Sequence, residues 1–95
     1  MITGKTSSGF EFSVSENLKT DFRFVAAYAD TQSDSEGEQA KGLVQLLNVV
    51  LGKKGAAALQ RHVALKDGTV PIKKLMAELG EIIRATSESD GAVKN

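Results

Sequence analysis

The residues of this 95-residue chain that are able to do covalent or metal chemistry are few. His62 is the only histidine, and the chain has no cysteine. Without cysteine there is no disulfide framework, no thiolate zinc site, no iron–sulfur cluster and no cysteine nucleophile. A general base at His62 would need a serine or acidic partner from elsewhere in the fold. We therefore expect His62 to be a half-exposed helix residue beside Val63.

Two partial motifs lack residues that their chemistry requires. Gly4-Lys5-Thr6-Ser7 has the form of a P-loop ending, but the earlier glycine and the following helix pattern are missing, which favours a turn-rich strand end. The acidic loop 30–38 has the composition of a calcium site. An EF-hand loop starting at Asp30 would need glycine where Ser35 stands and glutamate where Lys41 stands. These acids are better explained by the favourable electrostatics of a helix start.

Glu78 and Glu81 are the remaining pair that a catalytic interpretation might use. Three residues apart, they lie on one side of a predicted helix, which is typical of a solvated face. The sequence therefore predicts a protein that is not an enzyme and needs no cofactor or metal.

Apolar spacing predicts a mainly α fold, a small four-helix domain with an N-terminal β-hairpin. The hairpin, at about residues 2–14, alternates Phe10, Phe12 and Val14 with polar residues and has a Ser7-Ser8-Gly9 turn. Helical spacing predicts helices over 15–30, 36–51, 54–67 and 70–86. The first is capped by Ser15 or Thr20, a capping box starts the second and Gly52 ends it.

The chain is expected to form one domain over residues 1–86, followed by a disordered tail over residues 87–95. Hydrophobic residues make up 41% of the sequence, enough for a thin core. No apolar run approaches the roughly 20 residues of a membrane span, which predicts a cytoplasmic protein without a membrane partner. We expect Phe22 in the core.

The net charge of zero hides three blocks of opposite sign. Residues 1–40 carry three basic and seven acidic side chains, residues 41–74 seven and one, and residues 75–95 two and four. The basic block predicts either a surface for a protein partner or, as the alternative, a small DNA-binding or regulatory module. Overall neutrality argues against nucleic acid, whereas opposed blocks favour protein contacts, self-association included.

The order of short sequence segments resembles a known family. A Gly4-Lys5-Thr6-Ser7-Ser8-Gly9-Phe10-Glu11-Phe12 start leads to an acidic-aromatic helix and then to Leu46-Leu47-Asn48-Val49-Val50-Leu51-Gly52. Leu59-Gln60-Arg61-His62-Val63, the Asp67-Gly68-Thr69-Val70-Pro71 turn and an isoleucine-rich last helix follow. Over about residues 1–86 this resembles the tail assembly chaperones of long-tailed phages that infect Gram-positive bacteria.

The resemblance implies a non-enzymatic protein that binds the tape measure protein, keeps it soluble and helps to recruit tail tube subunits. It also implies a location in the host cytoplasm and absence from the mature virion. We assign candidate partner-binding residues from exposed-face patterns and from the basic block: Phe10, Phe12, Phe24, Tyr28, Lys53, Lys54, Arg61, Lys73 and Lys74. For the four aromatic residues, a place in the core is the alternative.

Overall fold

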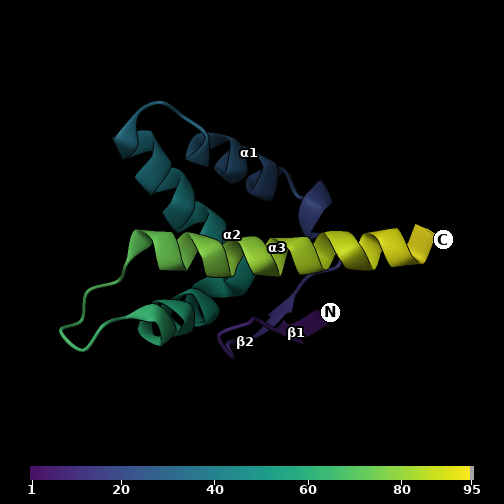
Figure 1. The fold of residues 1–95 in the computed structure, drawn as a ribbon. Coiled ribbons are helices and arrows are strands. Elements are labelled where there is room, and N and C mark those ends of the chain that lie inside the picture. The colour runs from purple at the N-terminus through teal and green to yellow at the C-terminus, as the bar shows by residue number, and fades with distance from the viewer. Residues whose placement is uncertain (95) are drawn as a thin grey trace.

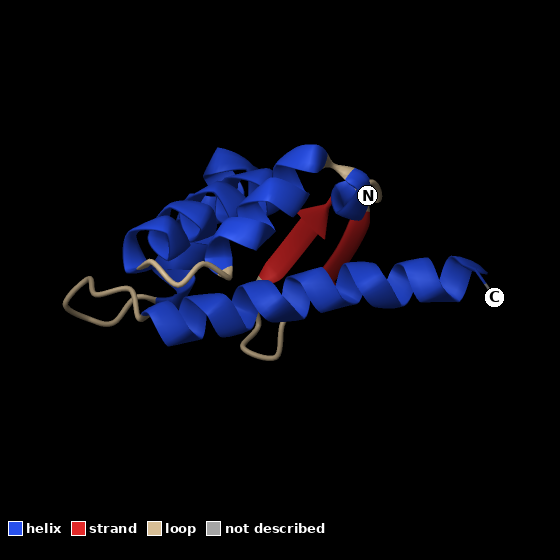
Figure 2. Ribbon diagram, turned by 90° about the horizontal axis from the view of Figure 1, so that it is seen from above, coloured by secondary structure: helices blue, strands red, loops and turns tan. Residues whose placement is uncertain are grey.

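A computed structural model describes the backbone of residues 1–94 and the side chains of residues 1–86. It is mainly helical, with a two-stranded antiparallel hairpin at the N-terminus (Figures 1 and 2). The elements are β1 Ile2–Lys5, β2 Glu11–Val14, a 3-10 turn Leu18–Thr20, α1 Phe22–Thr31, α2 Glu36–Val63 and α3 Ile72–Lys94. The predicted hairpin is confirmed, and the helix count is three where the sequence predicted four.

The helix count differs because the two central predicted helices form the single element α2. Gly52 does leave the helical region, with φ 75° and ψ 169°, a conformation that strains any residue with a Cβ atom. The chain becomes helical again directly after Gly52, so α2 consists of two helical parts that meet at a kink, and the expected interruption at Gly52 is confirmed. Ser35 caps α2 as the capping box predicts, since its side chain accepts a hydrogen bond from the Glu38 N–H.

The start predicted for the first helix, at about residue 15, is wrong. Residues Leu18–Thr20 form a separate 3-10 turn, and α1 begins only after Asp21, whose extended backbone has ψ 121°. The Asp21 carboxylate accepts the Arg23 backbone N–H at 2.9 Å and so caps α1, in place of Ser15 or Thr20. Hydrogen bonds from the Arg23 side chain lower the pKa of Asp21.

The connection between α2 and α3 is longer than predicted, because α2 ends at Val63. Residues 64–71 form a loop in which the Leu65 N–H donates to the Thr69 carbonyl at 2.8 Å and Gly68 has φ 91°. α3 follows Pro71, whose carbonyl accepts the Leu75 N–H at 3.0 Å. The backbone of α3 extends to Lys94, and the side chains of the predicted disordered tail, residues 87–95, lie outside the described residues.

The helices and the hairpin enclose one core. α1 packs antiparallel to the first half of α2, while α3 runs along the molecule with the hairpin beside it (Figures 1 and 2). In the hairpin Gly4 pairs with Phe12 and Ile2 with Val14, so that Phe12 and Val14 face inward as the alternation predicts. The most deeply buried large side chains include Leu59 of α2 and Ile82 of α3.

We expect Gly42→Ala to destabilise the protein. A Cβ atom at residue 42 would lie 2.6 Å from the Asp30 Cβ and 2.8 Å from the Thr31 backbone nitrogen, so α1 would have to move away from α2. Such overpacking typically costs about 1–3 kcal/mol. Gly80→Ala is the matched control, because nothing lies within 4 Å of its Cβ position and alanine favours a helix by about 1 kcal/mol. The urea concentration at the midpoint of unfolding should therefore fall for Gly42→Ala and rise for Gly80→Ala. Equal shifts of the two midpoints would contradict the close approach of α1 and α2.

Candidate functional site

A cluster of polar side chains joins the hairpin turn to the two long helices. The Thr6 and Ser8 hydroxyls each donate a hydrogen bond of 2.7 Å to Oε1 of Glu78 in α3. Ser8 Oγ also lies 2.9 Å from Nε2 of His62, in the last turn of α2. We call these four residues, Thr6, Ser8, His62 and Glu78, the polar clamp.

The turn itself holds the two hydroxyls of the polar clamp in place. The Thr6 N–H donates to the Phe10 carbonyl and the Gly9 N–H donates to the Thr6 carbonyl, both at 2.9 Å. Gly9 has φ 94°, the left-handed conformation that favours glycine. One helical turn along from Glu78, Glu81 accepts the Ser7 N–H and the Ser7 hydroxyl, both at 2.9 Å. The hairpin turn is therefore fastened to α3 by two glutamates.

The expectation that Glu78 and Glu81 form a solvated face is wrong for Glu78. Its side chain is buried, with 7% of its surface exposed, whereas Glu81 is partly exposed. A buried carboxylate needs hydrogen-bond donors, and Thr6 and Ser8 supply them from a segment about 70 residues earlier in the chain.

His62 is exposed, and its ring lies 5.4 Å from the ring of Phe10.

The polar clamp has the residue types of a serine hydrolase triad in a different order. In a triad the imidazole lies between the serine and the acid, and it accepts the serine proton. Here Ser8 lies between His62 and Glu78. Because the single Ser8 proton points to Glu78, the His62 Nε2 must donate its own proton to Ser8 Oγ. In this arrangement His62 does not accept a proton from Ser8. The polar clamp instead holds the hairpin turn against α2 and α3.

The structure separates the four aromatic candidates for partner binding. Phe10, Phe12 and Phe24 are buried in the core, so they present no surface to a partner, whereas Tyr28 is 47% exposed. The expectation that Phe22 lies in the core is wrong, since this side chain is 80% exposed. The reason is that α1 has two apolar sides, and the side with Phe24 and Ala27 faces inward.

The outward side of α1 carries an apolar stripe. Residues three, four and seven positions apart share one side of a helix. By this spacing Phe22, Val25, Ala26 and Ala29 lie opposite the buried side; Phe22, Val25 and Ala29 are exposed and Ala26 is partly exposed. We call these four residues the α1 stripe. Unlike the scattered single apolar residues of ordinary surfaces, they form a continuous row along one helix.

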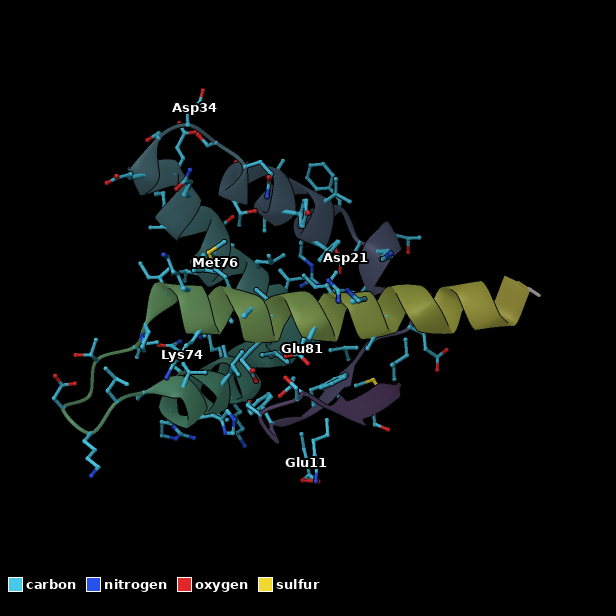
Figure 3. All side chains as sticks on the ribbon, viewed as in Figure 1. Glu11, Asp21, Asp34, Lys74, Met76 and Glu81 are labelled. Carbon is cyan, nitrogen blue, oxygen red and sulfur yellow. The ribbon has the colours of Figure 1, made fainter. Side chains whose placement is uncertain are left out.

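A second exposed apolar surface lies at the start of α3. Ile72 and Met76 are 64% and 48% exposed, and their spacing of four places them on one side of the helix. We call this pair the α3 edge. In Figure 3 the Met76 side chain points from α3 to the side where α1 and the first half of α2 lie, whereas Lys74 points to the side of the last turns of α2.

The five basic candidates are all exposed, but they do not form a single group. Lys53, Lys54 and Arg61 lie along the second half of α2, and Lys73 and Lys74 lie in the first turn of α3. By helical spacing Lys73 borders the α3 edge. Lys74 instead lines a hollow of about 370 Å³ together with Ser8, His62 and Glu78.

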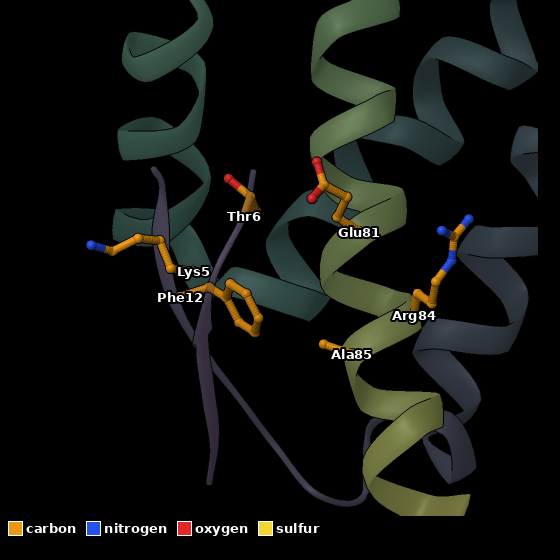
Figure 4. A pocket seen from close by; sticks show the side chains of 6 residues that line it. All are labelled: Lys5, Thr6, Phe12, Glu81, Arg84 and Ala85. Atoms are coloured by element: carbon orange, nitrogen blue, oxygen red, sulfur yellow. The ribbon is translucent and has the colours of Figure 1, made fainter. Parts of the chain in front are cut away.

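Another hollow, of about 300 Å³, opens between the hairpin and α3. Figure 4 shows Phe12 facing α3 across it, while the Lys5 and Arg84 side chains point away from it. Because its two cations do not converge, the hollow does not have the geometry of an anion site.

Among the residues that the structure describes, no cluster of three or more histidine or acidic side chains is placed to hold a metal ion. Within the same residues, no helix is both long and apolar enough to cross a membrane. Comparisons of the chain with protein-family models, with curated proteins and with solved structures find no match.

Proposed function

We propose that this chain is a non-enzymatic tail assembly chaperone of a long-tailed phage, acting by binding the tape measure protein. The observation that supports this most is the number of large apolar side chains that a thin-cored protein leaves exposed on its helices: Phe22, Val25, Tyr28, Val44, Ile72 and Met76. Exposed apolar rows on helices are suited to partner helices, which pack their own apolar stripes against them. The order of sequence segments resembles the same family.

The α3 edge is the surface that we assign to the tape measure protein. Ile72 and Met76 offer apolar contact, and Lys73 beside them adds positive charge. This combination fits an amphipathic helix whose apolar stripe is bordered by acidic residues. Tyr28, Lys53, Lys54, Arg61 and Lys74 remain candidates for contacts with other partners, including tail tube subunits.

The proposal includes a place and a time of action. The chain works in the host cytoplasm during assembly, covers the tape measure protein while the tail tube forms around it, and leaves before the virion is complete. A transient partner of this kind needs contacts that are reversible, and a small exposed apolar edge with one charged border fits that need.

Co-expression with a long helical fragment of the tape measure protein tests the proposal. We expect the chain to bring into the soluble fraction a fragment that is insoluble alone, and to co-purify with it. The double variant Ile72→Glu and Met76→Glu should lose both effects, because charge on the α3 edge opposes apolar contact. Leu65→Glu, at an exposed leucine in the neighbouring loop, is the matched control. A fragment that stays insoluble with the unaltered chain would contradict the proposal.

The alternative function is a small DNA-binding or regulatory module that uses residues 41–74. The observation that favours it is that Lys53, Lys54 and Arg61 are all exposed along one helical segment. Binding to duplex DNA that weakens steeply with salt would support this alternative. Retention of the tape measure fragment by a Lys53→Ala, Lys54→Ala, Arg61→Ala variant would favour the chaperone.

A further inference from the structure

The α1 stripe is a second exposed apolar surface, apart from the α3 edge that we assign to the tape measure protein. α1 packs through Phe24 and Ala27, and its opposite side has no covering element among the described residues. What should cover this side is indicated by the charges that border it.

Arg23 and Asp30 lie on the same border of the α1 stripe. They are seven residues apart, and two helical turns bring them back to nearly the same side. Both are exposed, and they stand at equal distances from the middle of α1, between Ala26 and Ala27. One border of the stripe thus carries a cation near the start of the helix and an anion near its end.

We propose that the α1 stripe is a self-association surface, on which α1 of a second copy packs antiparallel. A two-fold axis near Ala26 would place Arg23 of each copy opposite Asp30 of the other, giving two equivalent ion pairs. A parallel two-fold pair would instead carry the charged borders of the two copies to opposite sides of the contact, so that Arg23 of one copy would not meet Asp30 of the other. Antiparallel packing also sets each helix dipole against the opposite end of the other.

The side chains have the donors and acceptors that the arrangement needs. Arg23 bonds Asp21 within its own chain, with Nη2 at 2.6 Å from Oδ2, and the guanidinium has further N–H groups for a second carboxylate. Asp30 has no ion pair with any described residue. Its carboxylate is therefore available to a partner copy.

The surface is small, so the dimer is weak. A standard interface buries roughly 800 Å² on each partner, and one side of the ten-residue helix α1 offers less than that. We expect a dissociation constant above about 10 μM, and weaker association at high salt because the ion pairs are exposed. The proposal concerns the chain alone and does not depend on the tape measure protein.

Charge reversal with purified full-length protein tests the dimer. Sedimentation equilibrium at protein concentrations up to about 1 mM and low salt should show reversible dimers of the unaltered chain. Arg23→Glu and Asp30→Lys, tested singly, should each raise the dimer dissociation constant about tenfold, since each replaces attraction by repulsion. An equimolar mixture of the two variants should dimerise again, because an acidic border then meets a basic one. Circular dichroism checks that each variant is folded. Arg23→Glu removes the hydrogen bonds of the Arg23 side chain to the capping residue Asp21. Asp30→Lys tests the same ion pairs without touching that cap.

Cysteine cross-linking gives a second readout, since the chain has no cysteine of its own. Ala26→Cys, next to the proposed axis, should form a disulfide-linked dimer on mild oxidation, whereas Gln60→Cys on the exposed side of α2 should not. A monomeric unaltered chain at 1 mM, single variants that associate as strongly as the unaltered chain, or a mixture that stays monomeric would each overturn the proposal.

Discussion

Replacing Leu59 by alanine is expected to lower the free energy of unfolding by about 3 kcal/mol, within the range of about 2–5 kcal/mol for buried leucines. Leu59 has no exposed surface and belongs to the core that α2, α3 and the hairpin share. Removing its side chain leaves a cavity, and a 95-residue protein with a thin core has little other packing to compensate. Urea denaturation followed by circular dichroism measures the change.

Leu65→Ala is the control for this prediction. The two substitutions remove the same atoms, but Leu65 is 47% exposed in the loop between α2 and α3. We expect it to change the free energy of unfolding by less than about 1 kcal/mol. Similar losses for the two variants would contradict the placement of Leu59 at the centre of the core.

Removing the buried carboxylate of the polar clamp should lower the free energy of unfolding about as much as Leu59→Ala does. Glu78→Ala is expected to cost about 2–4 kcal/mol, because the Thr6 and Ser8 hydroxyls both lose a charged acceptor and Thr6 is itself buried. The hairpin turn should loosen before the rest of the molecule. Amide hydrogen exchange at Gly9 and Phe10, whose N–H groups both donate to Thr6, reports on that loosening.

Glu78→Gln separates the loss of charge from the loss of the acceptor. Both hydroxyls donate to the same oxygen, Oε1, and a glutamine carbonyl is able to accept two hydrogen bonds. We therefore expect this variant to cost only about 1 kcal/mol and to keep the slow exchange of the turn. If glutamine and alanine were equally destabilising, hydrogen bonding by Oε1 would not be the feature that fastens the hairpin.

The local features of the fold were predictable from the sequence because they depend on neighbouring residues. Alternation of Phe10, Phe12 and Val14 indicates a strand with one buried face, and the structure confirms it. The spacing of Ala56, Leu59 and Val63 likewise marks a buried helix side. Gly52 was expected to end a helix, and its left-handed backbone interrupts α2.

Features that depend on distant residues were not predictable in this way. α1 has two apolar sides, and its pattern does not say which side faces inward. Packing of α1 on α2 buries Phe24 and leaves Phe22 exposed. The polar clamp joins hydroxyls at Thr6 and Ser8 to Glu78, with no local signal in any of the three segments. A carboxylate three residues from another on a helix gives the same pattern whether it is solvated or buried.

Direct binding of the purified chain to a helical segment of the tape measure protein tests the central claim, that this is a binding protein whose α3 edge holds that partner. Fluorescence anisotropy of a labelled segment should rise on addition of the unaltered chain and of Asp30→Lys, which leaves the α3 edge intact. The rise should be lost with Ile72→Glu and Met76→Glu. Absence of binding by the unaltered chain, or equal binding by the α3-edge variant, would contradict the account.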